Sequence, residues 1–307
     1  MTTAIPICLF PMRKIILDDD QSFTESILLK MHGKNFSGYN SPKQAMRYLL
    51  DEYKVMLTKD HVATLDITAA IPTTQRTINI QIDALQQTIT NSAQHDVSVL
   101  FVDYHMPEMY GLDFLKEIQH LPMKKALITG ERDYKIGVDA LNSGLVDSYI
   151  RKDDPDFMNK FQQTALELEW KYFSSLSGLV TNMPDFSYLS NNHFIREFKQ
   201  YIRDNNIVSF CLTDTDGNFL LKNKNSEQKY LLVRDRAHLQ ELSKLALDDE
   251  GSNETINRLQ EGNVIPFFGH QKYWQIAASE WDGFLHPANS VMNDEKLVWA
   301  AVNSEVV

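Results

Sequence analysis

The stretch Val97-Ser98-Val99-Leu100-Phe101-Val102-Asp103 is a nearly continuous apolar run that ends in an aspartate. Such a run is typical of a central strand in a parallel sheet, because helices cover both faces of that sheet. A second short apolar run, Lys14-Ile15-Ile16-Leu17, is followed directly by Asp18-Asp19-Asp20. The two stretches therefore predict two buried strands, each with carboxylates at its end.

Two further strands are predicted outward from this centre, at residues 126–128 and 148–150, with Thr129 and Lys152 close behind them. Apolar residues at helical spacing predict helices at residues 111–120 and around residues 138–141. Strands that alternate with helices along the chain are typical of a parallel α/β sheet. Residues 56–96 do not follow this alternation, and we interpret them as an insertion with a possible helix through Ile78, Ile82 and Leu85.

A long helix is predicted after Lys152, and we treat residues 153–184 as a linker and dimerisation helix. Its apolar residues recur at steps of four and three, which is close to a heptad stripe. Two interpretations remain open: the helix packs only on its own sheet, or it also pairs with its copy in a homodimer. The stripe consists of Phe157, Phe161, Ala165, Leu168, Tyr172, Leu176 and Leu179.

Residues 185–307 follow a different pattern and predict a smaller α+β domain. Apolar runs at 207–212, 219–221 and 230–233 are separated by polar turns, which predicts an antiparallel meander. A helix is predicted at Ala237–Leu247, and late strands near Tyr273–Ala277 and Leu297–Val302. The sequence Asp214-x-Asp216-Gly217 resembles the start of a calcium loop, but no glutamate closes it, so we interpret it as a hairpin turn.

Composition excludes several classes of protein. The 307 residues include 30 Lys and Arg against 41 Asp and Glu, a net charge of -11, and neither half of the chain is basic. We therefore do not expect a domain that holds nucleic acid through phosphate neutralisation. Cys8 and Cys211 are too far apart in sequence to predict a disulfide framework or a metal site. No apolar run has the roughly 20 residues of a membrane helix, so we expect a soluble cytoplasmic protein without membrane contact.

The polar residues at the strand ends point to one site. In a parallel α/β sheet, ligands bind at the carboxyl ends of the strands, where Asp18, Asp19, Asp103, Thr129 and Lys152 are expected to meet. Clustered carboxylates repel one another unless a cation is present, and Mg²⁺ prefers oxygen ligands. Asp103 could then act as a nucleophile towards phosphorus and form an aspartyl phosphate.

At this point the chain resembles the receiver domains of bacterial two-component response regulators. The resemblance covers residues 13–152 without the insertion, so we assign residues 1–152 to a receiver domain with an N-terminal extension. It implies a doubly wound, flavodoxin-like sheet of five parallel strands. The matching motifs are Ile16-Leu17-Asp18-Asp19-Asp20, Leu100 to Pro107, Glu108 to Leu112, Leu127-Ile128-Thr129-Gly130 and Tyr149-Ile150-Arg151-Lys152.

The resemblance also implies roles for individual residues. Asp103 would accept a phosphoryl group from a sensor histidine kinase. Mg²⁺ would be held by Asp18, by Asp19 as a direct ligand, by Asp103 and by the main-chain carbonyl of His105. The imidazole of His105 either contacts an attacking water or simply faces solvent. No enzymatic activity is expected beyond self-phosphotransfer and autodephosphorylation.

Three more residues would bind the phosphoryl group or respond to it. The resemblance implies that Thr129 is the switch hydroxyl and that Lys152 binds the phosphate. Tyr149 is at the position of the rotating aromatic residue of the family, although core packing alone is an equally good interpretation. The proline that usually follows the lysine is absent here, so we do not expect the loop after Lys152 to keep the conformation usual in the family.

The architecture as a whole resembles the Lqs-type quorum-sensing response regulators, which implies an upstream quorum-sensing kinase and a dimer. The C-terminal domain contains no helix-turn-helix pattern, cyclase or esterase signature, or kinase ATP motif. Two interpretations of this domain remain open. It is a non-DNA-binding output domain for a protein or small ligand, or it is an unrecognised nucleotide-binding or catalytic module.

Overall fold

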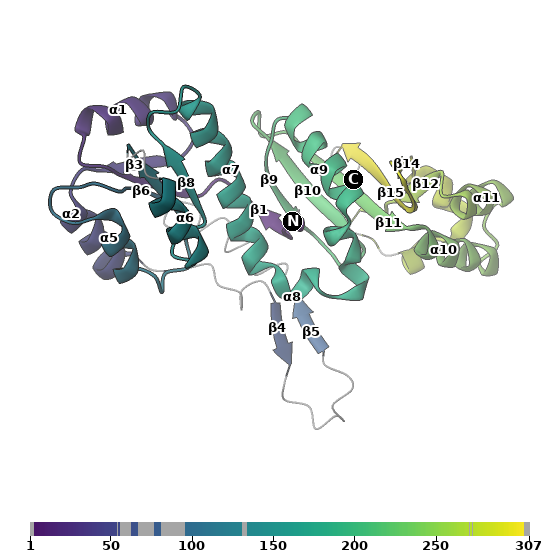
Figure 1. Cartoon of the computed structure of the whole chain (residues 1–307). Coiled ribbons are helices and arrows are strands. Elements are labelled where there is room, and N and C mark those ends of the chain that lie inside the picture. The colour runs from purple at the N-terminus through teal and green to yellow at the C-terminus, as the bar shows by residue number, and fades with distance from the viewer. Residues whose placement is uncertain are drawn as a thin grey trace. The chain divides into compact units, whose positions relative to one another are not determined.

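A computed structural model divides the chain into two compact units (Figure 1). The first, Phe10–Ser177, is called the α/β unit below. The second, called the C-terminal unit, combines Gly178–Val307 with Met1–Leu9. The structure describes residues 3–53, 55, 63–66, 77–80, 96–130, 134–269, 271 and 273–303.

The α/β unit is built on five parallel strands in the order β3-β2-β6-β7-β8. From β2 the chain first forms β3 on one side and then crosses over to form β6 on the other side. The position between β2 and β6 is therefore the topological switch point of a flavodoxin-like sheet. The predicted doubly wound, five-stranded fold is confirmed. The strands are β2 (Arg13–Leu17), β3 (Phe36–Tyr39), β6 (Val97–Asp103), β7 (Lys124–Thr129) and β8 (Ser148–Arg151).

Helices cover both faces of this sheet, and alternate residues of each strand point to opposite faces. Leu100 and Val102 of β6 join one core cluster with residues of α2, α5 and α6, whereas Val99 and Phe101 join another with residues of α1 and α7. The helices are α1 (Gln21–Lys30), α2 (Pro42–Arg47) with its π-helical continuation η1 (Tyr48–Glu52), α5 (Gly111–Glu117), α6 (Tyr134–Asn142) and α7 (Phe157–Leu176).

Helix α7 belongs to the α/β unit and packs on its sheet. Phe161, Ala165 and Leu168 of the predicted stripe are buried in the core cluster that contains Phe101. Glu169 forms an ion pair with Lys14 on β2, in which Oε1 lies 2.5 Å from Nζ. These stripe residues therefore pack on the sheet of their own chain, and pairing of the helix with a second copy stays a prediction. For the same reason the boundary between the units falls after Ser177 rather than after Lys152.

The C-terminal unit contains a six-stranded antiparallel sheet in the order β1-β9-β10-β11-β15-β14, and β12 pairs separately with β13. The meander from β9 to β11 and the α+β class are confirmed. The strands are β1 (Cys8–Leu9), β9 (Ile207–Leu212), β10 (Asn218–Asn223), β11 (Gln228–Asp235), β12 (Val264–Pro266), β13 (Leu285–Pro287), β14 (Asn289–Val291) and β15 (Asp294–Asn303).

The N-terminal residues differ from the expectation that they extend the receiver domain. Strand β1 pairs with β9, and Ile5 donates its backbone N–H to the carbonyl of Leu189, so this segment completes the C-terminal unit. Its apolar side chains, including Ile5 and Ile7, are fully buried. The need to bury this run explains why it joins a sheet that is formed almost 200 residues later in the chain.

The predicted helix at Ala237–Leu247 is confirmed, but the predicted strand at Tyr273–Ala277 is wrong. Residues 273–275 form a turn of 3₁₀ helix, and Tyr273 packs edge-on against Trp281. The aromatic residues there reflect packing around a short turn. The helical elements are α8 (Gly178–Thr181), η2 (Pro184–Ser190), α9 (Asn192–Asp204), α10 (Arg236–Asp248), α11 (Asn253–Glu261), η3 (Tyr273–Gln275) and η4 (Ala278–Phe284).

Most of the predicted insertion lies outside the described residues. Its described part is an antiparallel pair, β4 (Ala63–Asp66) and β5 (Thr77–Ile80). Ile78 is therefore in a strand, while Ile82 and Leu85 of the predicted helix lie outside the described residues. Among the helices that the structure describes, none has the length and apolar character needed to cross a membrane.

Candidate functional site

Three aspartates meet at the switch point of the parallel sheet. Asp18 follows β2 directly, and Asp103 is the last residue of β6. One carboxylate oxygen from each of Asp18, Asp19 and Asp103 lies within 4.8 Å of the others. Asp18 and Asp103 are buried, with exposed fractions of 0% and 4%, whereas Asp19 is exposed. The structure thus brings together the acidic residues that the sequence predicted.

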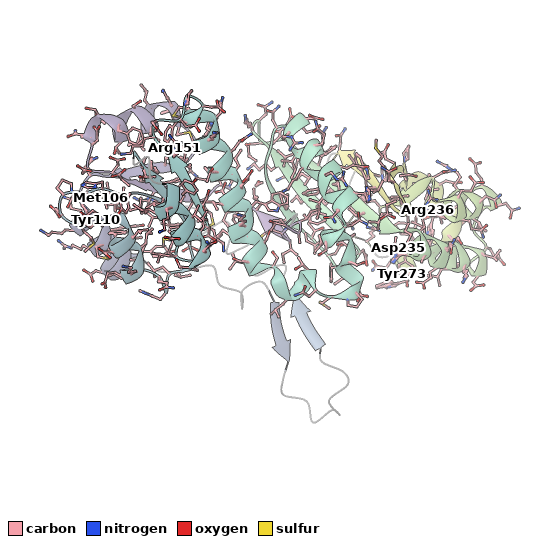
Figure 2. The ribbon with its side chains drawn as sticks, viewed as in Figure 1. Met106, Tyr110, Arg151, Asp235, Arg236 and Tyr273 are labelled. Carbon is pink, nitrogen blue, oxygen red and sulfur yellow. The ribbon has the colours of Figure 1, made fainter. Side chains whose placement is uncertain are left out.

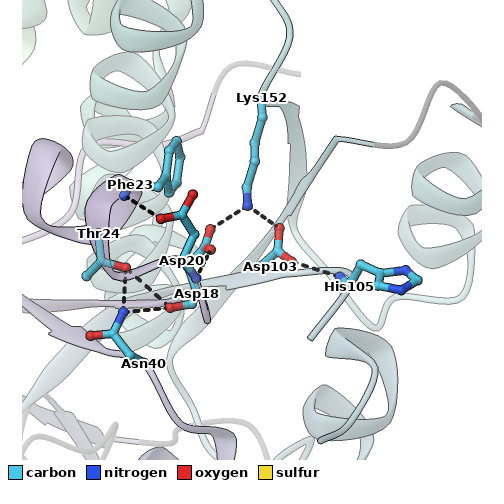
Figure 3. A network of polar contacts seen from close by, with 8 residues as sticks. All are labelled: Asp18, Asp20, Phe23, Thr24, Asn40, Asp103, His105 and Lys152. Atoms are coloured by element: carbon cyan, nitrogen blue, oxygen red, sulfur yellow. Dashed lines mark hydrogen bonds and ion pairs between the residues drawn. The ribbon is translucent and has the colours of Figure 1, made fainter. Parts of the chain in front are cut away.

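Lys152 joins this cluster from the loop after β8 (Figure 3). Its ammonium lies 2.6 Å from Asp18 Oδ2 and 2.7 Å from Asp103 Oδ1. Its backbone N–H donates to the carbonyl of Thr129, which continues the pairing of β7 with β8 beyond the last strand residue. Burial opposes the charge, but hydrogen bonds and charges from Asp103 and Asp18 raise the pKa of Lys152 above its ordinary value.

The loop after Asp103 is tight and holds the second oxygen of its carboxylate. The backbone N–H of His105 donates to Asp103 Oδ2 at 2.8 Å. His105 and Tyr110 form an isolated bridge that closes the loop, and Gly111 follows. A Cβ atom on Gly111 would lie only 2.1 Å from the carbonyl oxygen of Asp103, so this close approach requires glycine.

The imidazole of His105 is exposed and packs edge-on against the ring of Tyr110, with the ring centres 5.4 Å apart. Tyr110 is itself half exposed at the surface of the α/β unit (Figure 2). Its contact with His105 was not predicted. The contact places an aromatic pair beside the loop that carries Asp103.

The three consecutive aspartates have three different environments. Burial raises the pKa of Asp18 above its ordinary value, and Lys152 opposes this shift. Asp18 Oδ1 also accepts the backbone N–H of Asp20. The side chain of Asp20 caps α1 by accepting the backbone N–H of Phe23, so it serves the helix. Asp19 is exposed, and its carboxylate lies beside the buried carboxylates of Asp18 and Asp103.

Two polar residues that the sequence analysis missed hold the backbone at Asp18. Asn40 donates its side-chain amide to the carbonyl of Asp18 at 2.8 Å and to the hydroxyl of Thr24 at 3.0 Å (Figure 3). The rule that located Asp103 applies to Asn40 as well, because Asn40 directly follows β3. Thr24 lies within α1 and does not follow a strand, so this rule does not apply to it.

Thr129 and Tyr149 lie on the neighbouring strands β7 and β8, where Tyr149 is paired with Leu127. Thr129 is the last residue of β7 and is buried. Tyr149 is half-buried and packs on the core formed with α2, α5 and α6. Its ring lies against Gly137 of α6, where a Cβ atom would come within 2.7 Å of a ring carbon. Tyr149 therefore has a core-packing role in this state, and the small residue at 137 provides its seat.

Phe23 connects Lys152 to the start of α7. The ammonium of Lys152 lies 4.6 Å from the centre of the Phe23 ring, which is within cation–π range. The Phe23 ring in turn lies 5.6 Å from that of Phe157, the first residue of α7. The sequence analysis did not predict this contact, because it depends on how three separate segments meet.

The donor set suits a hard divalent cation. Three carboxylates face a single ammonium, so the cluster carries excess negative charge when all groups are ionised. Oxygen ligands around a small site at a strand end are the environment that Mg²⁺ prefers, with waters completing its coordination. The arrangement can also present the Asp103 carboxylate, next to a fixed positive charge, to a phosphorylated donor.

Comparison with known proteins agrees with this geometry. The family model described as the response regulator receiver domain matches residues 55–160, which include β6, β7, β8 and the beginning of α7. Asp18 and Asp19 lie before this match. No curated protein sequence matches the chain significantly.

A solved structure similar over nearly the whole chain is that of the Legionella pneumophila response regulator LqsR. It is 28% identical, the match covers 99% of this chain and 91% of that one, and the TM-score is 0.78. Two other similar structures are an adenylate cyclase from Rhodopirellula baltica and the receiver domain of the Francisella response regulator 1452. Both are 16% identical, cover 56% and 52% of this chain and 98% and 97% of their own, with TM-scores of 0.36 and 0.32. These scores are too low to inform on function.

Proposed function

Since this chain carries the receiver domain of a response regulator, we propose that it accepts a phosphoryl group on Asp103 from a sensor histidine kinase. The contact of Lys152 with both Asp18 and Asp103 is the observation that carries this proposal. The position of Asp103, a buried carboxylate at the end of the central strand β6, supports it rather than Asp18 as the acceptor.

In the proposed reaction, an oxygen of Asp103 forms a bond to phosphorus while the bond between phosphorus and the donor's histidine nitrogen breaks. Lys152 neutralises part of the negative charge on the transferred group. The hydroxyl of Thr129 donates a hydrogen bond to a phosphoryl oxygen. Hydrolysis of the resulting acyl phosphate by water returns Asp103 to its carboxylate.

Mg²⁺ is the proposed cofactor, and it supplies further neutralisation of the phosphoryl oxygens when bound. The carboxylates of Asp18, Asp19 and Asp103 and the main-chain carbonyl of His105 would hold it. The grouping of the three carboxylates within 4.8 Å supports this assignment. Asp19 is the accessible member, which suits a direct ligand.

We infer that phosphorylation reaches α7 by two routes. In the first, Thr129 moves towards the phosphoryl group and Tyr149 follows it in its seat against Gly137. In the second, Lys152 leaves Asp18 for the phosphoryl group and changes its contact with Phe23, which packs on the first residue of α7. Both routes bias the packing of α7 between two states.

The proposed output is a protein or small-ligand interaction of the C-terminal unit, without DNA binding. Similarity to LqsR over both units supports a place in quorum-sensing signal transduction in the cytoplasm, where a histidine kinase delivers its phosphoryl group. Large apolar side chains on the surface of the C-terminal unit favour a protein partner; among them are Leu247, Trp274 and Met292.

A homodimer is proposed through the face that β8 and the outer side of α7 present. Leu166 on α7 is 66% exposed, unlike the buried residues of the heptad stripe. We expect Leu166→Glu to reduce dimer formation in light scattering with beryllofluoride and Mg²⁺. Leu29→Glu on α1, at a leucine that is 79% exposed, should leave dimer formation unchanged. A wild-type protein that stays monomeric with and without beryllofluoride contradicts the dimer.

Phosphorylation itself is tested by intact mass. We expect wild-type protein with acetyl phosphate and Mg²⁺ to gain the mass of one phosphoryl group, and Asp103→Asn to gain none, because an amide is a poor nucleophile. Asp113→Asn is the matched control, since Asp113 is an exposed aspartate of α5 that pairs with Lys116. An adduct of equal amount in Asp103→Asn contradicts the assignment of the acceptor.

A further inference from the structure

The two cysteines of the chain lie opposite each other in the C-terminal unit. Cys8 is in β1, at one edge of the six-stranded sheet, and its partner in the register is Cys211 of β9 (Figure 1). The sequence analysis did not pair them, because they are about 200 residues apart. The register of β1 on β9 creates the pair, and both thiols are free in this structure.

The hydrogen-bond pattern shows which kind of pair this is. The backbone N–H of Leu212 donates to the carbonyl of Ile7 at 2.7 Å, so the neighbouring pair is a hydrogen-bonded one. Pairs alternate along antiparallel strands, and Cys8 and Cys211 therefore form a non-hydrogen-bonded pair, where the Cα atoms are about 4.5 Å apart. This separation lies within the range of about 4.4–6.8 Å found for disulfides.

Directly opposed residues also point to the same face of a sheet, so the two Cβ atoms approach each other. The negative charge of one thiolate would be felt by the other, which contributes to the raised pKa of Cys8 after the larger effect of burial. Geometry and proximity thus agree that a bond between the sulfur atoms needs no change in register.

We propose that Cys8 and Cys211 form a reversible disulfide when the chain meets a small-molecule disulfide such as oxidised glutathione. The thiolate of one cysteine attacks glutathione disulfide, forms a mixed disulfide and releases one glutathione thiolate. The thiolate of the other then attacks the protein sulfur of the mixed disulfide and releases the second. The two protein thiols are oxidised, one glutathione disulfide is reduced to two glutathiones, and the two protons pass to them.

Burial controls how fast this reaction proceeds. Cys8 is fully buried and Cys211 nearly so, and burial raises the pKa of Cys211 to about 12. Few thiolates therefore exist in the closed sheet, and exchange requires β1 to open. Strand β1 is two residues long and lies at the sheet edge, where local opening costs less than global unfolding. The same burial protects the disulfide from reduction once it has formed.

The bond would have a defined structural effect. The entire α/β unit, Phe10–Ser177, lies between the two cysteines in the chain. A disulfide would close a covalent ring that contains this unit and would fix β1, which precedes β2 by only three residues, to β9. Oxidation would thus prevent release of the N-terminal segment from the C-terminal unit.

The test is thiol counting in glutathione buffers of increasing oxidised fraction. The full chain is equilibrated, denatured with a maleimide present, and measured by intact mass. We expect both thiols to be lost together, with a protein mass lower by two hydrogens and no retained glutathione. On a non-reducing gel the product should migrate as a monomer.

Two variants test whether the position of the cysteines matters as well as their number. Cys8→Ser leaves one cysteine and should retain a free thiol or a mixed disulfide. Cys8→Ser combined with Leu9→Cys keeps two cysteines but moves one to the opposite face of β1, opposite Phe210. We expect this shifted pair to lose its ability to form the bond within the chain.

If no disulfide forms, either the oxidant reaches the buried thiols slowly or the bond itself is unfavourable. These two causes are distinguished by approaching equilibrium from both sides. One sample starts as folded reduced protein, and the other is unfolded, reduced and then refolded in the same oxidising buffer. A disulfide in both, or in the refolded sample first, supports the proposal. The proposal is overturned if both samples keep two free thiols in a buffer whose redox potential oxidises ordinary vicinal dithiols. Equal oxidation of the shifted pair also overturns it.

Discussion

Each unit of the molecule buries charged groups next to a strand end, and the two clusters differ in how their charges are compensated. In the C-terminal unit, the buried guanidinium of Arg234 donates to the carbonyls of Asp216 and Val233 and to Asn218 Oδ1. Asp214 accepts the backbone N–H groups of Asp216 and Asn218, which caps the hairpin turn before β10. This confirms the predicted turn.

The α/β unit uses the same kinds of groups differently. Lys152 contacts two carboxylates, and Asp19 adds a third within 4.8 Å, so negative charge remains in excess. The polar groups around Arg234, in contrast, bind backbone and amide groups and fix a turn. Buried charge alone therefore does not identify a functional site. Excess negative charge at the carboxyl end of parallel strands is the feature on which the proposed site rests.

The largest expected effect is on stability and follows from the structural cluster. Arg234→Met removes the hydrogen-bond donor to two carbonyls and to Asn218. We expect the free energy of unfolding of the C-terminal unit to fall by roughly 3 kcal/mol. Urea unfolding followed by tryptophan fluorescence measures this loss. Arg196→Met, at an exposed arginine of α9, is the control. Phosphorylation by acetyl phosphate should persist in Arg234→Met, and its loss would mean that the two clusters are not independent.

A smaller effect is expected at the proposed metal site. Asp19→Ala removes one carboxylate ligand, and we expect Mg²⁺ affinity to fall at least about tenfold, since even outer-shell changes at metal sites have effects of this size. Titration calorimetry measures the affinity. Asp20→Ala is the matched control, because the side chain of Asp20 caps α1. Equal loss of affinity in both variants would show that general negative charge, rather than ligation by Asp19, attracts the ion.

The smallest effect distinguishes the clusters by pH. Burial raises the pKa of Asp18 in the native state, so the native state binds this proton more tightly than the unfolded chain. The resulting stabilisation is fully present below the unfolded pKa of about 3.9 and is lost as pH rises through the native value. The ionised carboxylate therefore costs stability at pH 7.

We accordingly expect Asp18→Asn to be more stable than wild type at pH 7 without Mg²⁺. The difference should shrink towards zero as the pH falls to about 4. Added Mg²⁺ should stabilise the wild type more than the variant, because only the wild type has the full ligand set. Thermal unfolding of both proteins across this pH range tests the sign. A variant less stable than wild type at pH 7 would mean that the Lys152 contact outweighs the cost of burial.

The sequence located the site because its logic is local. Each of Asp18, Asp103, Thr129 and Lys152 follows an apolar run, and parallel strands place such positions at one edge. Asn40 fits the same rule and could have been found. Phe23 could not, because its contact with Lys152 depends on the packing of α1 against the loop after β8.

The fold was predictable to the same extent. Parallel strands with continuous apolar runs were recognised, whereas the pairing of β1 with β9 was not, since β1 is short and its partner is distant in sequence. The heptad stripe of α7 was ambiguous because a helix that packs on a sheet and a helix that pairs with its copy use the same spacing. Burial of Leu168 in the core of the α/β unit shows that the stripe packs on its own sheet, whereas pairing with a second copy stays a prediction.

The central claim, that the cluster in the α/β unit is a phosphorylation site on Asp103, is tested most directly by reductive trapping. An acyl phosphate of aspartate is reduced by borohydride to homoserine, which peptide mass spectrometry locates. After treatment of wild-type protein with acetyl phosphate and Mg²⁺, we expect homoserine at position 103 and unmodified aspartate at positions 18, 19 and 214. Homoserine at another aspartate, or none in a protein that has gained a phosphoryl group, would contradict the account.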